Sequence, residues 1–226
     1  MTDRSGVWRW LHRPVRPWHW LLELLLPATC LGCDELGRSP WCEPCARRLP
    51  FAPRTPWGVE GVPLHAPFLY APPASAAVRR FKYDGRADFA FALASLMHER
   101  LATCGESGAN LIVPVPLHER RLAERGFNQA ALLSRVLGQR LGIACAPTAL
   151  VRTRSTVPQA RMARDGRLRN LQSAFRASQP HKLNLHRVLL VDDVVTTGAT
   201  ARACMDAIRE AGADVVGVVS VCAALK

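Results

Sequence analysis

Apolar residues follow two patterns after residue 74. Short continuous runs bounded by turn residues are typical of strands that are buried on both faces. These runs occupy residues 110–113, 188–191 and 215–221. Longer segments with apolar residues at helical spacing occupy residues 74–83, 88–104, 128–141 and 199–211. Continuous apolar strands joined through a crossover helix predict an α/β fold, in which a parallel sheet is flanked by helices.

The hydrophobic pattern is weaker in the remaining segments. Residues 50–73 are rich in proline and glycine and suit edge strands or loops, and residues 149–151 predict one short strand. Residues 7–26 interleave tryptophan and leucine with arginine, which predicts a short amphipathic helix. We therefore expect three parts, namely an amphipathic N-terminal extension at 1–27, a four-cysteine module at 28–50 and the α/β domain at 51–226.

The N-terminal extension has an apolar run that partly resembles an export signal. The run, residues 18–26, is interrupted by Glu23 and is too short to span a bilayer. We expect the extension to pack on the main domain, and contact with a membrane surface or a partner is the alternative. We accordingly expect no transmembrane span, reduced cysteines and a cytoplasmic location.

Composition and charge narrow the function. A hydrophobic content of 49% in 226 residues is enough for a buried core. The net charge of +12 is concentrated in residues 117–187, which hold 14 Arg or Lys against 3 Asp or Glu. A concentrated basic stretch favours a focused anionic site or groove over diffuse binding to nucleic acid. For each arginine taken singly, a solvated surface charge is the alternative.

Two adjacent acidic residues, Asp192 and Asp193, follow the apolar run 188–191. In open α/β sheets, ligands bind at this edge of the sheet. The next residues form a small-residue loop that opens a helix, whose N–H groups and threonine hydroxyls suit a phosphate. The carboxylates suit the vicinal hydroxyls of a ribose. Together they predict a site for a sugar 5'-phosphate, and the alternative is an ordinary strand end with a capped helix.

This stretch resembles the phosphoribosyl-diphosphate motif of type I phosphoribosyltransferases, which consists of four apolar residues, Asp-Asp and Thr-Thr-Gly-x-Thr. The resemblance implies a type I phosphoribosyltransferase-like domain that binds 5-phosphoribosyl-1-diphosphate together with Mg²⁺. It implies that Asp192 and Asp193 act in catalysis by orienting the ribose. The implied binding residues are Asp192, Asp193, Val195, Thr196, Thr197, Gly198, Ala199 and Thr200.

Two arginine-rich segments add to this site. Arg120, Arg121 and Arg125 follow the strand at 110–113, where a loop could hold a diphosphate. Further on lies a stretch without an apolar stripe, similar to the flexible loop that closes over substrate in type I phosphoribosyltransferases. Its candidate residues are Gln159, Arg161, Arg169 and Asn170.

The same segments resemble one family, the ComF/GntX proteins. Pro-Val-Pro-Leu, Arg-Gly-Phe-Asn-Gln, Thr-x-Pro-Gln, the Asp-Asp loop and an N-terminal cysteine module occur together in that family. The resemblance covers nearly the whole length after residue 27. It implies a role in DNA uptake by competent bacteria or in nucleotide metabolism, with an acceptor that is generally undefined.

Four cysteines, Cys30, Cys33, Cys42 and Cys45, lie within sixteen positions as two Cys-x2-Cys pairs. Four thiolates with no open position predict a structural zinc site. A metal-free pair of redox motifs is the alternative. Nearby arginines also permit contact with nucleic acid.

Several functions remain compatible with these residues. A phosphoribosyltransferase would release diphosphate as a nucleophile attacks the ribose, with Lys82 and Tyr83 as acceptor candidates or merely a surface helix end. A non-catalytic sensor of phosphoribosyl diphosphate would instead bind single-stranded DNA and proteins of the competence machinery. A third possibility is a zinc-dependent DNA-binding module alone. The sequence specifies no oligomeric state.

Overall fold

The computed structural model describes residues 29–36, 40–53, 57–105, 108–153 and 174–224. The N-terminal extension predicted at 1–27 lies outside these residues. Within the described ranges, none of the helices combines the length and the apolar character that crossing a membrane requires.

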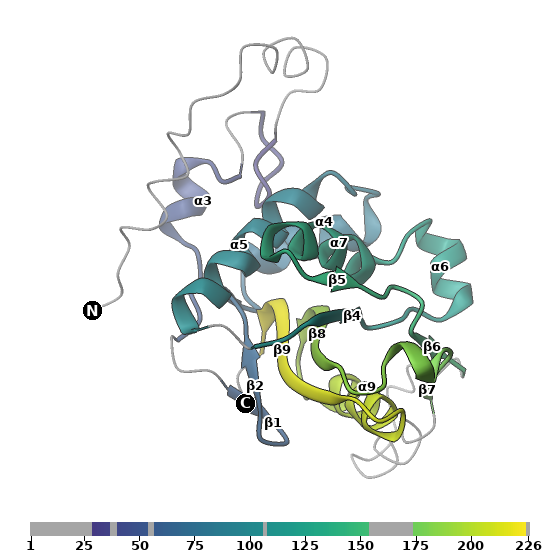
Figure 1. Cartoon of the computed structure of the whole chain (residues 1–226). Helices are drawn as coiled ribbons and strands as arrows, with labels where there is room; N and C mark the ends of the chain where they lie inside the picture. The colour runs from purple at the N-terminus through teal and green to yellow at the C-terminus, as the bar shows by residue number, and fades with distance from the viewer. Residues whose placement is uncertain (1–28, 37–39, 54–56, 106–107, 154–173, 225–226) are drawn as a thin grey trace.

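A seven-stranded sheet forms the centre of the molecule (Figure 1). In spatial order its strands are β1 (Trp57–Val59), β2 (Val62–His65), β9 (Asp214–Ala223), β8 (Arg187–Val195), β4 (Leu111–Pro114) and β5 (Ala144–Cys145), with β3 (Phe68–Leu69) paired to β9. All neighbours are parallel except β1, which forms an antiparallel hairpin with β2. The parallel centre confirms the predicted α/β class.

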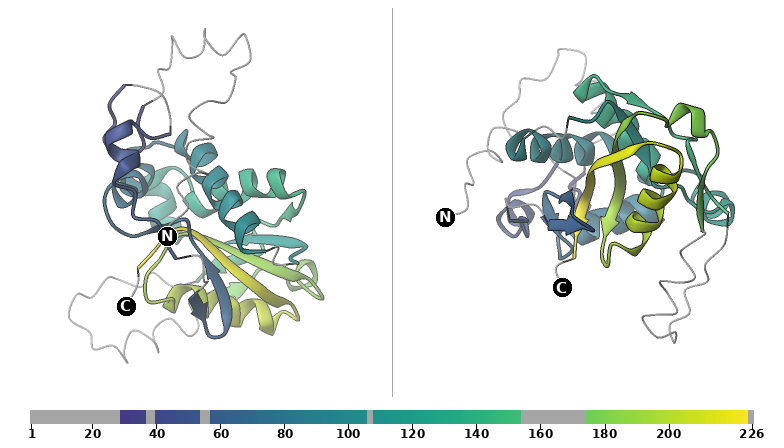
Figure 2. Two further views of the ribbon diagram at one scale, coloured as in Figure 1. Left: turned by 90° about the vertical axis from the view of Figure 1, so that its left-hand side faces the viewer. Right: turned by 60° about the horizontal axis from the view of Figure 1, so that its bottom comes forward.

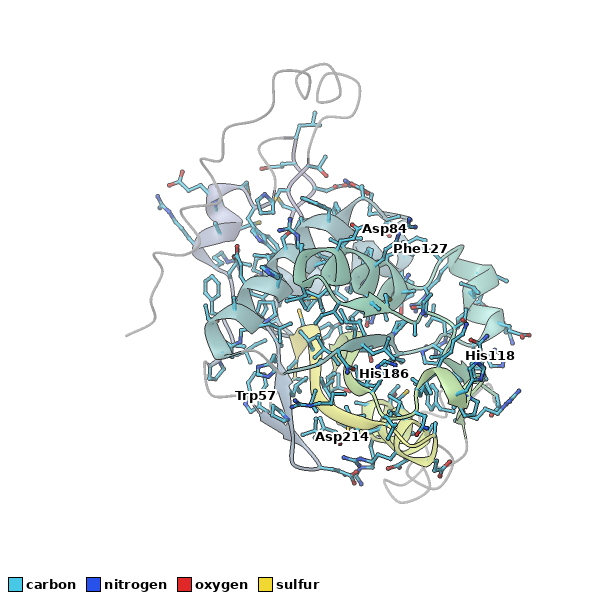
Figure 3. All side chains as sticks on the ribbon, in the orientation of Figure 1. Trp57, Asp84, His118, Phe127, His186 and Asp214 are labelled. Atoms are coloured by element: carbon cyan, nitrogen blue, oxygen red, sulfur yellow. The ribbon has the colours of Figure 1, made fainter. Side chains whose placement is uncertain are left out.

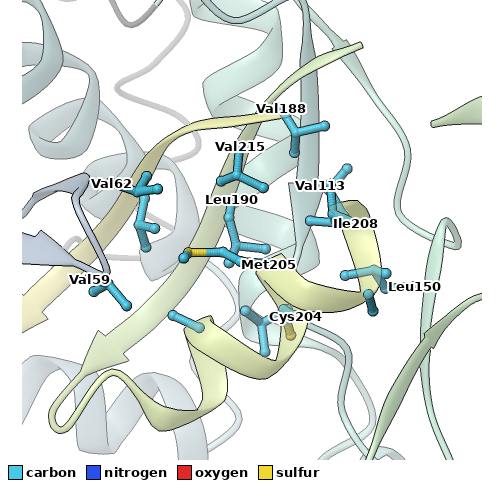
Figure 4. Close-up of a cluster of buried hydrophobic side chains, with 14 of the residues drawn as sticks. Val59, Val62, Val113, Leu150, Val188, Leu190, Cys204, Met205, Ile208 and Val215 are labelled. Carbon is cyan, nitrogen blue, oxygen red and sulfur yellow. The ribbon is translucent and has the colours of Figure 1, made fainter. Parts of the chain in front are cut away.

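Helices cover both faces of this sheet (Figure 2). One face packs against α4 (Ala74–Tyr83), α5 (Phe89–Cys104) and α7 (Gln129–Leu141), and the other packs against α9 (Ala199–Glu210). Figure 4 shows the second apolar cluster, where Met205 and Ile208 of α9 lie close to Val113, Val188 and Leu190 of the sheet. The four predicted helices are thus confirmed to within a residue at each end.

Strand β8 contributes to both apolar clusters because successive side chains of a strand point to opposite faces. Val188 and Leu190 belong to the α9 side, whereas Leu189 and Val191 belong to the side of α4, α5 and α7. All four side chains are fully buried. Burial on both faces explains why the run is continuously apolar rather than alternating.

Strand β8 extends further than the apolar run predicts. The run ends at Val191, but Val194 and Val195 still pair with Cys222 and Ala223 of β9. Asp192 and Asp193 therefore lie inside the strand and not beyond its end, because the ladder to β9 continues past the last large apolar residue.

Two other segments differ from the sequence-based expectation. Residues 119–125, expected as a loop, form helix α6 (Glu119–Arg125), which begins after His118 and ends at Gly126 in the left-handed conformation. The short strand expected at 149–151 is β6 (Leu150–Arg152), which within the described residues pairs with β7 (Phe175–Ala177), in a separate antiparallel sheet. The hairpin of β1 and β2 agrees with the edge strands expected in residues 50–73.

The four-cysteine module packs directly on the α/β domain. It contains an isolated bridge between Thr29 and Leu36 and the short helix α3 (Glu43–Arg47). Leu31 and Trp41 are buried in the same cluster as α4, and the Trp41 ring meets the Phe68 ring edge-on at 5.7 Å between centroids. The module therefore shares its apolar core with the domain.

Candidate ribose-phosphate site and cysteine cluster

Asp193 forms an ion pair with a lysine from a distant helix. Lys82 Nζ, in the last turn of α4, lies 2.8 Å from Asp193 Oδ1, and Asp193 is only 7% exposed. A nearly buried carboxylate needs such a partner, because desolvation of an unpaired charge costs several kcal/mol. Lys82 is thus placed against the acidic pair, whereas sequence reasoning offered it as an acceptor contact or a surface helix end.

Asp192 lies on the opposite face of β8, on the side of α9. Burial, and next the negative charge of Asp193, raise the pKa of Asp192 to about 8, although the positive charge of Lys82 acts against this. Asp192 Oδ1 accepts a hydrogen bond from the backbone N–H of Asp193 at 2.8 Å. Asp192 therefore favours its protonated form near neutral pH, beside the ion pair between Lys82 and Asp193.

Arg152, at the end of β6, is a basic residue near Asp192 that the sequence candidates omitted. Burial lowers the pKa of Arg152, as does the charge of Arg121 in α6, while the charge of Asp192 raises it. Its guanidinium lies 5.4 Å from the centre of the Phe175 ring. The only signal in the sequence was its position, directly after the apolar run 149–151 and before the arginine-rich stretch.

The predicted phosphate loop connects β8 to the N-terminus of α9. Thr196 and Thr197 are exposed, and Gly198, with φ of 74°, is the left-handed residue before the helix. A side chain at Gly198 would also approach Val59 to 3.2 Å, so the turn favours glycine for two reasons. Gly198 has no side chain that could cap α9, Thr197 Oγ1 accepts a hydrogen bond from Ala199 N–H at 3.4 Å, and the first turn of α9 holds no acidic residue. The backbone N–H groups in the first turn of α9 that lack an acceptor within the helix suit an anion.

The three arginine candidates of the diphosphate segment lie on α6 with different partners. Arg120 is largely exposed and pairs with Glu124 at 3.2 Å, whereas Arg121 is half-buried. Arg125 lies 4.9 Å from the centre of the Tyr83 ring and donates a hydrogen bond to Gln129 Oε1. Phe127, labelled in Figure 3, precedes α7, and its ring meets the Phe81 ring of α4 at 5.8 Å between centroids.

The structure thus brings together only some of the residues that the sequence predicted for the ribose-phosphate site. Strand β8, the phosphate loop and Lys82 meet at one end of the sheet, and the hydrogen bond from Val115 N to Val191 O brings the start of the α6 segment beside them. The flexible-loop candidates lie outside the described residues, in the segment between β6 and β7. They are Gln159, Arg161, Arg169 and Asn170.

The four predicted cysteine ligands come together. All four Sγ atoms lie within 4.8 Å of one another, and Cys33 Sγ and Cys42 Sγ are 3.5 Å apart. Four thiolates around one zinc ion at about 2.3 Å place sulfur atoms roughly 3.8 Å apart, so the cluster fits a tetrahedral Zn²⁺ site. The shortest of these separations is far longer than a disulfide bond of about 2.05 Å.

Backbone groups of the module favour a thiolate at Cys30. Burial acts to raise the pKa of Cys30, but hydrogen bonds from the backbone of Cys42, Cys33 and Gly32 outweigh it and lower the pKa to about 7. Burial and the neighbouring thiols raise the pKa of Cys45. In the metal-free cluster, the thiols therefore ionise unequally, and a cation would favour ionisation of all four.

Fold and sequence comparison define the class of protein. The mainly parallel sheet has helices on both faces, and its β8–loop–α9 unit lies in a part of the chain that matches a phosphoribosyltransferase domain. Residues 122–226 match the family model described as "Phosphoribosyl transferase domain". This match includes β8, the loop and α9, but not α4 or the cysteine module.

Whole-chain relatives narrow the class to one family. DNA utilization protein YhgH of Salmonella typhimurium is 39% identical, over 89% of this chain and 100% of that protein. YhgH of Escherichia coli O157:H7 is 33% identical over 96% of both chains, and competence protein F of Haemophilus influenzae is 29% identical over 84% of this chain and 87% of that protein. The chain belongs to the family of DNA utilization protein YhgH, which confirms the predicted ComF-type relationship.

Metal content is the first test of the cysteine cluster. We expect the purified protein to carry one zinc ion per chain, and Cys42→Ser to reduce this well below one, because three thiolates and a hydroxyl bind zinc poorly. Elemental analysis by mass spectrometry measures both. Cys104→Ser, at the end of α5 and outside the cluster, should retain the metal. Full zinc content in Cys42→Ser would contradict the assignment.

The raised pKa of Asp192 predicts a pH-dependent stability. Folding raises this pKa from near 4 to about 8, so the folded state binds an extra proton in that range and loses stability as pH rises through it. Asparagine at position 192 cannot ionise, so Asp192→Asn does not lose this stability as pH rises. Its Tm advantage over wild type should grow by about 3 °C or more from pH 5 to pH 8 and then level off.

Differential scanning calorimetry of both proteins across this range measures the effect. Asp214→Asn, an exposed carboxylate at the start of β9, is the matched control and should shift Tm by the same small amount at every pH. A constant offset for Asp192→Asn as well would show that Asp192 ionises normally in the folded protein.

Proposed function

We propose that the β8–α9 unit binds 5-phosphoribosyl-1-diphosphate. The observation that carries this proposal is that an acidic pair, with Asp193 buried and Asp192 half-buried, and a helix N-terminus that begins after Gly198 lie within eight residues, at one end of a parallel sheet. The N-terminus of α9, with a partial charge of roughly +0.5, suits the 5'-phosphate, together with the hydroxyls of Thr196, Thr197 and Thr200. The backbone of Val195, Gly198 and Ala199 would line the same loop.

The acidic pair is suited to hold the ribose. Asp193, in its ion pair with Lys82, would accept a hydrogen bond from one ribose hydroxyl. Asp192, when protonated, could donate to a second hydroxyl oxygen, and it could accept once ionised. Both residues would orient the sugar, and the carboxylate of Asp193 would stabilise positive charge that develops at C1 in a transfer reaction.

The basic residues are suited to the diphosphate. Arg121 and Arg152 lie on the Asp192 side of β8, and Arg120 and Arg125 flank Arg121 on α6. Their guanidinium groups would neutralise the charge that collects on the leaving diphosphate. Mg²⁺ chelated by the diphosphate would supply further charge neutralisation when bound. The described residues hold no separate cage of carboxylates for this ion.

A transfer reaction also needs an acceptor and exclusion of water. Tyr83 is 68% exposed beside Arg125 and offers an aromatic face to an acceptor, whereas Lys82 is already engaged with Asp193. Gln159, Arg161, Arg169 and Asn170 remain predictions for a closing loop. A phosphoribosyltransferase that acts in the cytoplasm on an undefined nucleophile is the function that these residues support best.

The names of the relatives supply the cellular context of the proposal. YhgH is a DNA utilization protein, and the Haemophilus influenzae relative is a competence protein. We infer a role for this chain in DNA uptake or in the metabolism of nucleotides from that DNA. A sensor of phosphoribosyl diphosphate that works with the competence machinery would need the same binding site without turnover.

Calorimetric titration with phosphoribosyl diphosphate and Mg²⁺ tests the binding proposal. We expect wild type to bind, and the double variant Asp192→Asn with Asp193→Asn to bind about a hundredfold more weakly, because it loses the charged acceptors for ribose. The control is again Asp214→Asn. Absence of binding by folded, zinc-loaded wild type would refute the proposal. Release of diphosphate across a panel of bases and amines then separates an enzyme from a sensor.

A second candidate function is binding of single-stranded DNA. Two Arg–aromatic pairs lie at the surface of the helical face, with Arg125 at 4.9 Å from the Tyr83 ring and Arg140 at 4.8 Å from the Phe91 ring. Tyr83 and Phe91 are both more than 60% exposed. Exposed aromatic rings next to guanidinium groups can stack on bases and contact phosphates.

Fluorescence anisotropy with a labelled oligonucleotide tests this second function. Affinity should fall steeply as salt rises, and Phe91→Ala with Arg140→Ala should weaken binding about tenfold or more and reduce the salt slope by roughly 0.7. Arg209→Ala, exposed in the last turn of α9, is the matched loss of charge elsewhere. Equal effects of both changes would indicate diffuse attraction and exclude these pairs as a site.

A further inference from the structure

Helix α4 contacts both the cysteine module and the acidic pair through its last turn. The Arg80 guanidinium donates hydrogen bonds to the backbone carbonyls of Gly32, at 2.5 Å, and Leu31, at 3.2 Å. Two residues later, Lys82 Nζ lies 2.8 Å from Asp193 Oδ1. Two side chains in the last turn of α4 therefore contact two parts of the chain that are far apart in the sequence. Arg80 contacts the cysteine module, and Lys82 contacts the acidic pair.

The module also contacts α4 at both of its ends. At the N-terminal end, a Cβ atom added to Gly32 would lie 2.8 Å from Pro73 Cβ and 2.9 Å from Cys45 Sγ, so this turn is packed tightly between the helix and a zinc ligand. Beyond the C-terminal end, Arg86 donates hydrogen bonds to Asp34 Oδ1 at 2.6 Å and to Thr29 Oγ1 at 2.8 Å. A shift of the module would therefore have to move the helix.

The acceptors of Arg80 depend on the closed form of the first Cys-x2-Cys turn. Leu31 and Gly32 are the two residues between Cys30 and Cys33, and their carbonyls point to Arg80 only while that turn is formed. Closure of four thiolates around a cation would fix the turn. Lys82 in turn must be positioned accurately, because a nearly buried ion pair is stable only with good geometry.

We propose that the cysteine module is a positioning device for the acidic pair: it fixes α4 through Arg80, and thereby sets the geometry of the Lys82–Asp193 ion pair. This inference rests on the proposed ribose-phosphate site and assigns Arg80 and Lys82 as positioning residues. A cation held by the four thiolates would then act on substrate affinity from outside the site, through α4.

A double-mutant cycle read by calorimetry tests the link. Arg80→Ala should weaken binding of phosphoribosyl diphosphate with Mg²⁺ about tenfold while leaving all four cysteines in place. Lys82→Met should weaken it by at least as much. The double variant should bind no more weakly than Lys82→Met alone, because both changes act through one ion pair. Arg79→Ala, the exposed neighbour on the same helix, is the matched control.

Hydrogen exchange of backbone amides gives a readout that needs no ligand. In Arg80→Ala, exchange at residues 192–197 should be faster than in Arg79→Ala, with unchanged exchange at the buried centre of α7. If wild type binds no phosphoribosyl diphosphate but this exchange pattern appears, the proposed function fails and the link stands. Additive losses of affinity in the cycle, or equal exchange in the Arg80 and Arg79 variants, would overturn the link.

Discussion

The molecule is organised around one constraint on strand β8, which must bury apolar side chains on both faces and then carry two carboxylates in the same strand. Alternation of side chains sends Asp193 toward Lys82 of α4 and leaves Asp192 on the α9 side. Neither group can be left as a lone buried charge. The positions of α4, of β6 and of the phosphate loop are all consistent with this requirement.

The two carboxyl groups meet that requirement in different ways. Asp193 forms an ion pair with an ammonium group 2.8 Å away, whereas burial and the charge of Asp193 raise the pKa of Asp192 to about 8. Adjacent acids in unequal environments are a common means of giving two carboxyl groups different roles. In a ribose site, one group of this kind accepts hydrogen bonds while its neighbour can exchange a proton.

The cysteine module fits the same scheme as an integral part of the domain. Leu31 and Trp41 are buried in a cluster with α4, and Arg80 and Arg86 hold the module by hydrogen bonds at the end of that helix. A module of this size could scarcely fold on its own apolar core. Its contacts show how four clustered cysteines that could hold a metal are joined to the α/β domain in this chain.

The sequence by itself determined the parallel α/β class, the four long helices, the grouping of Cys30 with its three partners and the Asp192–Thr200 motif. These features follow from local periodicity and spacing, which a single chain displays directly. Tertiary structure alone decided that Lys82 faces Asp193, that Arg152 lies near Asp192, and that β6 leaves the main sheet. Such contacts join residues 40 or more positions apart or depend on strand pairing, and the hydrophobic pattern of the sequence specifies neither.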